Sequence, residues 1–205
     1  SPSLNDYLRA DQAIQKLAAE LWPQTDGAGE RRVGKGRVIT GKTFETIFEE
    51  DALSPDFQAN STFADSEVRY IHRKLATGEM YYVSNQKERV EELILNFRVT
   101  GFVPEAWDPV TGEKSELLMY HDDGSSTAVA LRMAPYDAQF IVFRKAVEAR
   151  DAVMELLKDG KRVRSLTQQA EVVPELSPTL RAGATGNAKL RVWESGEYAL
   201  TFQDG

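Results

Sequence analysis

The hydrophobic period of this chain changes at about Glu67, from the three- and four-residue steps of a helix to the two-residue steps of a strand. Beyond that point, apolar and polar residues alternate in EVRYIHRK, EMYYVSN, LILNFRVTG, TAVALRM and QFIVFRK. Turn-forming stretches such as ATGE, SNQKE and HDDGSS separate these runs. Short strands at this spacing are typical of an antiparallel β-sandwich, which we predict over residues 59–145.

Residues 1–58 have helical and α/β character instead. The stretch DYLRADQAIQKLAAELW places its apolar residues on one helical face, with Asn5 or Asp6 as the N-cap and Pro23 as the stop. A polar loop, PQTDGAGERRVGKG, precedes one short strand, RVIT, and a second helix begins near Phe44. One strand between two helices cannot form a parallel sheet alone. We therefore interpret residues 1–58 as the C-terminal piece of an α/β domain.

Residues 146–205 are interpreted as a β-rich continuation, the start of a further β-region. VEARDAVMELLKDG fits either a helix ending at Gly160 or a hairpin that turns at Asp159-Gly160, and the hairpin is favoured. Residues 168–187 have the composition of a loop. KLRVW-ESG-EYALTF predicts a second hairpin, with Leu190 and Val192 facing the strand that contains Leu200. Both ends of the sequence read as cuts within a larger protein.

The composition excludes several classes of partner and chemistry. Acidic residues outnumber basic ones, 32 to 25, and the formal net charge is −7, so we expect neither a nucleic-acid nor a membrane partner. The chain has no cysteine, which excludes disulfides, thiol catalysis and cysteine-ligated metals. No apolar run approaches the ~20 residues of a membrane-spanning helix, and the compartment stays undecided on these grounds.

The stretch FVPEAWDPVTGE poses the sharpest functional question. Glu105 and Asp108 flank Trp107, as an acid pair around a sugar ring would in a glycosidase. However, both acids lie in one short segment, whereas catalytic acids usually come from separate elements with different environments. Asp-Pro followed by Gly is also a strong turn signal. We therefore favour a turn, with Trp107 packed beneath it.

Three further patterns favour structural interpretations. GRVITGKT matches the spacing of a phosphate-binding loop, but its central residues are the best strand candidate, so a strand-to-helix turn at Gly41 is favoured over nucleotide binding. HDDG could begin a calcium loop, but the downstream glutamate of such a loop is missing, so a solvated hairpin tip is favoured. The two histidines, His72 and His121, are too few for a usual metal cluster, and no GxSxG motif supports a catalytic triad.

The order of the motifs resembles the β-sandwich region downstream of the catalytic barrel in glycoside hydrolase family 106. The resemblance is carried by YIHRKLATGEMYYVSNQ (70–86), FRVTGFVPEAWDPVTGE (97–113) and FIVFRK (140–145). Upstream, SPSL, LAAELW and ALSPDF are similar to the α/β segment that precedes this sandwich. The resemblance covers residues 1–145 well, and it covers residues 146–205 only as a generic continuation into the next β-region.

The resemblance implies hydrolysis of terminal α-L-rhamnosyl linkages, with inversion at the anomeric carbon and calcium in the active site. It also implies an exported bacterial parent, periplasmic or extracellular. The family's catalytic acids belong to its barrel, which needs ~250 residues, and no position here corresponds to them. We therefore expect no catalytic residue, metal site or cofactor in this chain; calcium would belong to the parent's catalytic domain.

These observations together predict a mainly β fragment with a short N-terminal α/β segment, acting as a non-catalytic accessory part of a large bacterial glycoside hydrolase. Its expected partner is the catalytic domain of the same parent chain. The alternative is a carbohydrate-binding module that stacks sugars on exposed aromatic rings such as Tyr136 and Trp193. The residues most able to touch substrate from the side are Glu105, Trp107, Tyr120 and His121.

Overall fold

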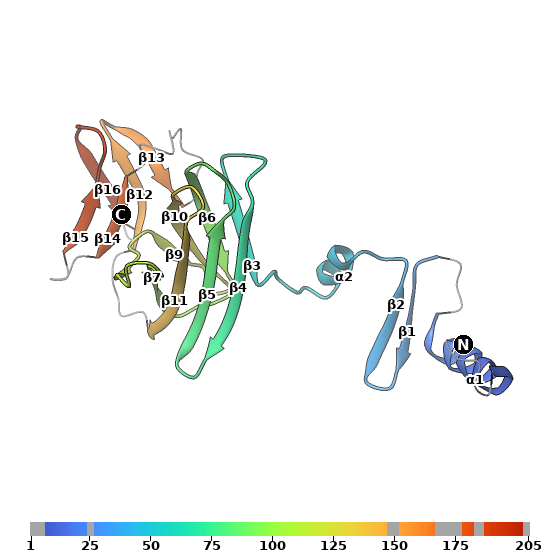
Figure 1. Ribbon diagram of the computed structural model, residues 1–205. Helices are drawn as coiled ribbons and strands as arrows, with labels where there is room; N and C mark the ends of the chain where they lie inside the picture. Colours follow the sequence, from blue (N-terminus) through green and yellow to red (C-terminus); the bar gives the residue numbers. More distant parts are fainter. Residues whose placement is uncertain (1–6, 24–26, 147–151, 167–177, 183–186, 203–205) are drawn as a thin grey trace. The chain divides into compact units, whose positions relative to one another are not determined.

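The computed structural model describes residues 7–23, 27–146, 152–166, 178–182 and 187–202. It divides into two compact units, residues 1–54 and residues 55–205 (Figure 1). Strands dominate, and the pairings within each sheet are antiparallel. The prediction of a mainly β chain is confirmed.

The first unit contains two helices and one hairpin. Helix α1 (Tyr7–Leu21) and helix α2 (Phe44–Glu50) appear where the periodicity predicts them, and Thr43 caps α2 by accepting a hydrogen bond from the Thr46 backbone. Between them, β1 (Gly29–Val33) pairs with β2 (Gly36–Thr40). The prediction that GERRV belongs to a loop is wrong. Its exposed charged side chains gave no apolar alternation, and the pairing depends on the tight turn at Gly34, where φ is +58°.

The second unit is built around two facing sheets. One has the order β3-β6-β10-β9 and the other the order β4-β5-β11-β7-β8. The bounds of the first are Phe57–Ser61, Glu91–Phe97, Thr127–Met133 and Tyr120–Asp122, in that order. Those of the second are Val68–Leu75, Gly78–Asn85, Ala138–Ala146, Phe102–Trp107 and Lys114–Glu116. Strand β3 pairs with β6, so the sheet begins at residue 57, two residues before the predicted sandwich.

The main core fills the space between these two sheets. Strand alternation sends every second side chain inward, and the largest buried ones include Tyr81, Leu95, Phe97, Met133 and Phe143. The β4–β5 hairpin closes against this core at Gly78, where φ is +152° and a Cβ would lie 1.9 Å from the Phe143 carbonyl oxygen. Only glycine fits that position.

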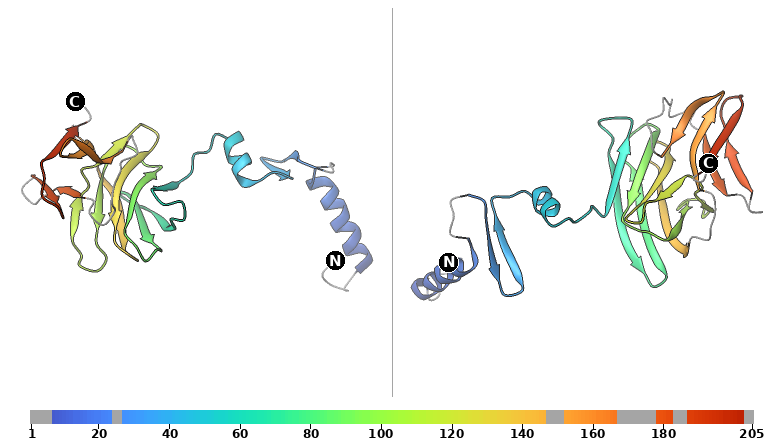
Figure 2. Two further views of the ribbon diagram at one scale, coloured as in Figure 1. Left: turned by 90° about the horizontal axis from the view of Figure 1, so that it is seen from above. Right: turned by 180° about the vertical axis from the view of Figure 1, so that it is seen from behind.

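Three further strands form a sheet with the order β13-β12-β16, and two form the β14-β15 hairpin. Their bounds are Val153–Lys158 (β12), Lys161–Ser165 (β13), Thr179–Ala182 (β14), Ala188–Arg191 (β15) and Tyr198–Phe202 (β16). A second core joins them to the outer side of the β3-containing sheet through Met119, Ala130, Val153, Leu156 and Leu180. In both views of Figure 2 these C-terminal strands lie on the side of the sandwich away from β3 and β4.

The C-terminal region confirms one local prediction and corrects two. The hairpin at Asp159-Gly160 is present, with φ of +50° and +75° at those residues, as a tight two-residue turn requires. The predicted KLRVW-EYALTF hairpin is wrong, because β15 pairs with β14 and β16 pairs with β12. Residues 179–182 form β14 rather than a loop, and the rest of 168–187, apart from Pro178 and Asn187, lies outside the described residues.

Candidate functional site

The segment FVPEAWDPVTGE is a strand followed by a turn. Strand β7 pairs with β11 on one side and β8 on the other, so residues 102–107 belong to the sheet rather than to the turn. The turn begins at Asp108, whose Oδ1 accepts hydrogen bonds from the backbone N–H groups of Val110 (2.7 Å) and Thr111 (2.9 Å). The bonds from Thr111 and Val110 lower the pKa of Asp108. Asp108 therefore acts as a turn residue, as expected.

Glu105 lies on the outer face of the five-stranded sheet and is 3% exposed. Its Oε2 accepts hydrogen bonds from Trp107 Nε1 (2.8 Å) and Arg144 Nε (3.1 Å), and Lys145 Nζ lies 3.4 Å from Oε1. Burial alone would raise the pKa of Glu105, but the bonds from Trp107 and Arg144 and the charges of Arg144 and Lys145 outweigh it and lower that pKa. The side chain is thus held as a carboxylate.

The structure also brings Glu116 beside Glu105, because the two residues are direct partners across β7 and β8. Lys145 Nζ bridges them, at 2.8 Å from Glu116 Oε1. A glycosidase acid needs a raised pKa so that it can give up a proton near neutral pH. Two carboxylates joined by a lysine, one with a lowered pKa, suit an ion-pair network that fixes three strands together.

Trp107 belongs to a row of half-buried aromatic rings across the same face. Tyr82, Phe140 and Trp107 are successive cross-strand partners on β5, β11 and β7, and the Tyr82 and Phe140 ring centroids are 5.0 Å apart. Lys114 Nζ lies 3.9 Å and Arg144 Cζ 5.1 Å from the Trp107 ring. Trp107 therefore stands in a row of cation-flanked rings on the sheet, and the expectation that it packs beneath the turn needs this correction.

Tyr120 and His121 lie elsewhere, on β9 of the other sheet. Tyr120 is 5% exposed and packs in the main core, so its ring is not open to a sugar. His121 is half-buried, and its Nδ1 has no hydrogen-bond partner among the described residues. The four predicted substrate-contacting residues are thus brought together only in part, as the pair Glu105 and Trp107.

The HDDG stretch forms a hairpin tip whose carboxylates accept hydrogen bonds from backbone N–H groups. Asp122 accepts hydrogen bonds from the Gly101 and Gly124 backbones, at 2.6 and 2.9 Å. Asp123 accepts from the Ser125 hydroxyl and from the backbones of Ser125 and Ser126, which lowers its pKa to about 2. Among the described residues, no group of three acidic or histidine side chains could hold a metal ion.

The GRVITGKT stretch and His72 also have local structural roles. Lys42 Nζ pairs with Glu50, 2.6 Å from Oε2, at the start of the seven-residue helix α2, and Gly36–Thr40 is strand β2, so the strand-to-helix turn is confirmed. His72 lies between two carboxylates, 3.1 Å from Asp56 through Nδ1 and 3.0 Å from Glu79 through Nε2. Its ring stacks on Tyr81 with centroids 4.0 Å apart.

Sequence reasoning missed a polar pocket of about 250 Å³ in the second unit. It is formed where β10, β11 and the β7–β8 turn meet the β14–β15 hairpin. Its charged lining residues are Asp108, Glu113, Arg132, Asp137, Arg181, Lys189 and Arg191, with Ser115, Gln139 and Trp193 among the others. The sequence did carry one signal, since Lys189 and Arg191 alternate with Leu190 and so share one face of β15.

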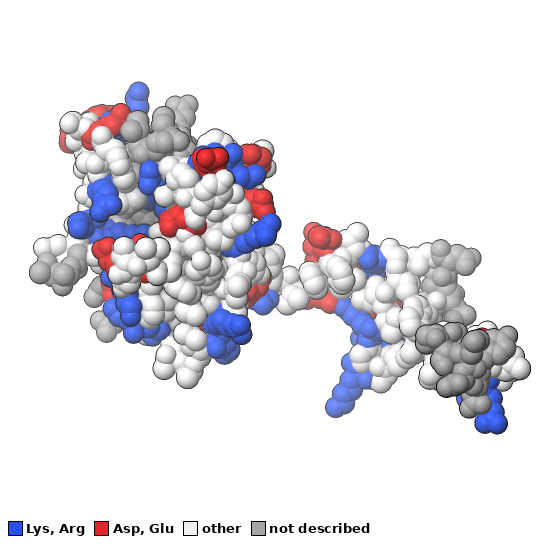
Figure 3. All heavy atoms as spheres, in the orientation of Figure 1, with Lys and Arg blue, Asp and Glu red and all other residues white. Residues whose placement is uncertain are grey.

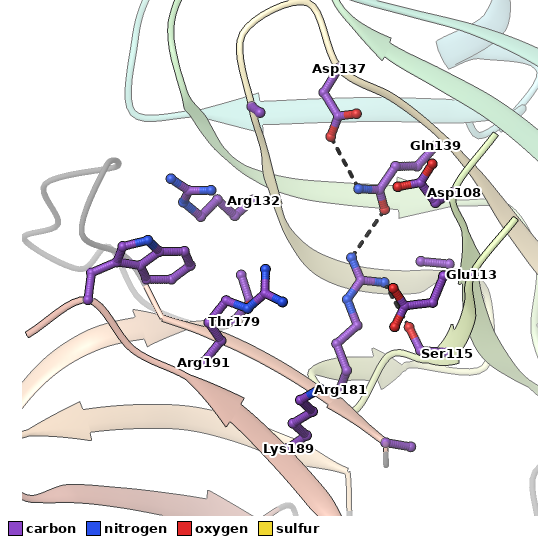
Figure 4. Close-up of a pocket in the computed structure, with 14 residues that line it drawn as sticks. Asp108, Glu113, Ser115, Arg132, Asp137, Gln139, Thr179, Arg181, Lys189 and Arg191 are labelled. Atoms are coloured by element: carbon purple, nitrogen blue, oxygen red, sulfur yellow. Dashed lines mark hydrogen bonds between the residues drawn. The ribbon is translucent and has the colours of Figure 1, made fainter. Parts of the chain in front are cut away.

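Hydrogen bonds connect one wall of this pocket to the next. Asp137 Oδ2 accepts from Gln139 Nε2 (3.2 Å), Gln139 Oε1 accepts from an Arg181 amino group (3.2 Å), and Arg181 also donates to Ser115 Oγ (3.3 Å) (Figure 4). At the rim, the Arg132 guanidinium lies 4.6 Å from the Trp193 ring centroid. Elsewhere on the face seen in Figure 3, acidic and basic side chains of residues 55–205 are interspersed.

The antiparallel sandwich, with its acids held in ion pairs and turns, defines a mainly β domain. A family model described as alpha-L-rhamnosidase, glycoside hydrolase family 106, matches residues 1–122. The chain belongs to this family.

Two similar proteins support this assignment. The solved structure of a rhamnosidase from Novosphingobium sp. PP1Y matches 77% of the chain with a TM-score of 0.64 and 35% sequence identity. A protein of Formosa agariphila, named "Putative beta-glucuronidase", is 27% identical over 156 residues, or 75% of the chain. The chain spans only 16% of the first protein's length and 12% of the second's. No helix among the described residues is long and apolar enough to cross a membrane.

Proposed function

We propose that this chain is a non-catalytic accessory domain of a large bacterial glycoside hydrolase that acts on α-L-rhamnosyl linkages in polysaccharides or glycosides. The observation that carries the proposal is its family membership combined with its share of the relatives' length, 16% and 12%. A piece of this size leaves most of such an enzyme, including room for a catalytic barrel, outside the matched region. The relative named as a beta-glucuronidase extends the proposed substrates to glycosides that contain uronic acids.

The electrostatics of the chain support the non-catalytic role. Glu105, the acid best placed on an aromatic face, has a lowered pKa and two basic neighbours, Arg144 and Lys145. A retaining or inverting glycosidase needs one carboxyl kept protonated as the acid. Any calcium in the whole enzyme would, on this proposal, be held by the catalytic domain.

The first unit supplies a means of contact with that catalytic domain. Several apolar side chains of its two helices are exposed, including Leu8, Ile14 and Leu17 on α1 and Phe44 and Phe48 on α2. Apolar faces of this extent are expected to be covered by another part of the protein. We assign the cover to the catalytic domain of the same parent chain, which the sandwich would then brace.

The test is a hydrolysis assay of the purified chain with an aryl α-L-rhamnoside. We expect no turnover above that of a mock purification. Release of the aryl group that scales with the amount of chain and is lost in Glu105→Gln would contradict the proposal. Glu116→Gln is the matched control, since it removes a neighbouring carboxylate from the same network.

A second candidate function is carbohydrate binding by the aromatic row of Tyr82, Phe140 and Trp107. Flat rings at successive cross-strand positions match the way that sugars stack on aromatic faces. Calorimetric titration with rhamnose-containing oligosaccharides should then give heat that Trp107→Ala abolishes and Trp22→Ala, in the first unit, preserves. An absence of heat at millimolar ligand would contradict this candidate.

A further inference from the structure

We propose that the pocket between β11, the β7–β8 turn and the β14–β15 hairpin binds the negatively charged group of an acidic sugar, either a carboxylate or a sulfate ester. The anionic character of the ligand follows from the pocket itself, whereas its identity as a sugar rests on the proposed function. None of the similar proteins' names assigns a ligand to this place. The aromatic row lies on the outer face of the sheet, so the two sites are different.

The pocket concentrates positive charge in an acidic protein. The whole chain carries a net charge of −7, yet four of the seven charged side chains that line the pocket are cationic. The backbones of Lys189 and Arg191 pair with β14, but their side chains have no ion pair or hydrogen bond within the described part of the chain. Cations left without partners beside a hollow attract anions from solution.

Arg181 provides the central donor. It is half-buried, and its two hydrogen bonds go to neutral oxygens, those of Gln139 and Ser115. Burial lowers the pKa of Arg181 and the positive charge of Arg164 lowers it further, and together they outweigh the opposite effect of the carboxylates of Glu113, Asp137 and Asp108. A guanidinium withdrawn from water gains most from an anion, and its planar fork matches a carboxylate or a sulfate group.

The charges in the pocket are also segregated. In Figure 4, Arg132 and Arg191 lie on one side of Arg181, and Asp108 and Glu113 lie on the other. An anionic group would bind on the arginine side, while the hydroxyls of the same sugar could donate hydrogen bonds to the Glu113 carboxylate. A neutral sugar would meet the acids but would offer no charged partner to Arg191.

The remaining features favour a single sugar ring over an extended chain. The volume of about 250 Å³ is below the range of ~300–1,000 Å³ that is typical of pockets for drug-sized ligands. Trp193 is 42% exposed at the rim and offers an indole ring for stacking beside the charged group. The guanidinium of Arg132 lies against this ring and fixes its position.

The experiment is calorimetric titration of the 205-residue chain with matched sugars. The probes are methyl β-glucuronide, glucose 6-sulfate, neutral methyl β-glucoside and inorganic sulfate. We expect at least one acidic sugar to bind about tenfold more tightly than the neutral one. This difference should shrink as salt is added, because the contacts are ionic. Binding of methyl β-glucuronide would identify the anionic group as a carboxylate, and binding of glucose 6-sulfate would identify it as a sulfate ester.

Arg191→Gln should weaken binding of that acidic sugar by about tenfold, and Arg181→Gln should weaken it further. Arg73→Gln is the matched control, since Arg73 is exposed on β4 and does not line the pocket. Lys189 is exposed, so Lys189→Gln should leave the fold unchanged, and we expect it to weaken binding of the acidic sugar too. Thermal denaturation checks the fold of each variant.

Three results would overturn the proposal. They are equal binding of acidic and neutral sugars, no binding of either acidic sugar at millimolar concentration, and binding of inorganic sulfate without either acidic sugar. None of them depends on rhamnoside hydrolysis. A failure here is therefore distinguishable from a failure of the non-catalytic role, which is measured by the release of the aryl group.

Discussion

The two units of this chain use their apolar residues in opposite ways. In the sandwich, strand alternation directs Leu95, Phe97 and Phe143 into a shared core from which water is excluded. In the first unit, α1 has an equally regular apolar stripe, yet none of the side chains described in residues 8–54 is buried. Amphipathic patterning is thus common to both units, but only the sandwich supplies the second surface that makes a core.

The sandwich is thus stabilised by its own packing, and the first unit by whatever surface covers it. Short helices draw most of their stability from tertiary contacts. The seven residues of α2 and the hairpin β1–β2 have no buried side chain, and their contacts within the unit are polar ones near the surface, such as Arg37 with Asp51 and Arg31 with the Ala19 carbonyl oxygen. The covering surface that we propose is the catalytic domain of the parent chain.

The largest expected effect comes from removing one core ring. Phe143→Ala should lower the free energy of unfolding by about 3–5 kcal/mol, because Phe143 is fully buried and its neighbours cannot close the cavity. Phe48→Ala, the matched change in α2, should leave that free energy nearly unchanged, since Phe48 is 46% exposed. Urea titrations followed by circular dichroism measure both. Equal losses of unfolding free energy in the two variants would contradict the difference in packing between the two units.

A smaller loss is expected from the buried ion pair that ties β13 to β6. Arg164 Nε donates to Glu92 Oε2 at 3.0 Å, and both side chains are buried. Arg164→Met should cost about 3 kcal/mol, because it removes the charged donor from a buried carboxylate and Arg132 lies farther off, at 4.0 Å.

The control in the first unit is Lys42→Met, which removes the partner of Glu50. Glu50 is 45% exposed at its side chain, so water replaces the lost contact and the expected change is below about 1 kcal/mol. The same urea titrations compare the two variants. A cost for Lys42→Met as large as that for Arg164→Met would show that the first unit has a core of its own.

Next comes Glu105→Gln, with an expected loss of about 1–2 kcal/mol at pH 7, since charge-assisted hydrogen bonds from Trp107 and Arg144 weaken. The folded-state pKa lies below the ordinary value of 4.5, so the carboxylate stabilises the fold above pH 4.5 and loses this contribution as the pH falls through the folded value. The difference between wild type and variant should therefore shrink in acid. Unfolding curves at several pH values test this, and a gap that widens in acid would contradict it.

The smallest effects are two carboxyl titrations followed by NMR. Asp123, in the sandwich, should titrate at a pKa of about 2, because it accepts several hydrogen bonds from Ser125 and Ser126. Its contribution to stability is present above pH 3.8 and is lost as the pH falls through the folded value.

Glu45 provides the comparison in the first unit, where hydrogen bonds to its own backbone N–H and to Thr43 lower its pKa in the folded helix. If α2 frays without its covering domain, Glu45 in this chain should titrate close to the ordinary value of 4.5. A clearly lowered pKa at Glu45 would show that α2 is stable by itself.

The sequence predicts those parts of the fold that depend on local patterns. Strands β4, β5, β6, β10 and β11 follow from alternation, and the β12–β13 hairpin follows from Asp159-Gly160. The sequence did not predict strand β7, because it contains Pro104 and proline is normally absent from central strands. The structure accommodates it beside a β-bulge, since the register between β7 and β11 shifts just after its partner Phe143.

The missing elements are those decided by long-range pairing. Nothing local distinguishes β16 paired with β15 from β16 paired with β12, because either arrangement satisfies the same alternation. The pocket depends even more on long-range packing, because Asp108, Arg132 and Arg181 come together only when the β14–β15 hairpin packs against the sandwich. The Glu105–Trp107 pair was found because both residues lie on one strand.

We expect the sandwich to be stable alone, whereas residues 1–54 depend on another domain of the parent. Native-state hydrogen exchange on the 205-residue chain measures this difference amide by amide. We predict strong protection of the backbone amides in β6, β10 and β11, with little protection in α1 and α2. Protection of the α1 amides equal to that of the β10 amides would show that the first unit is stable without another domain.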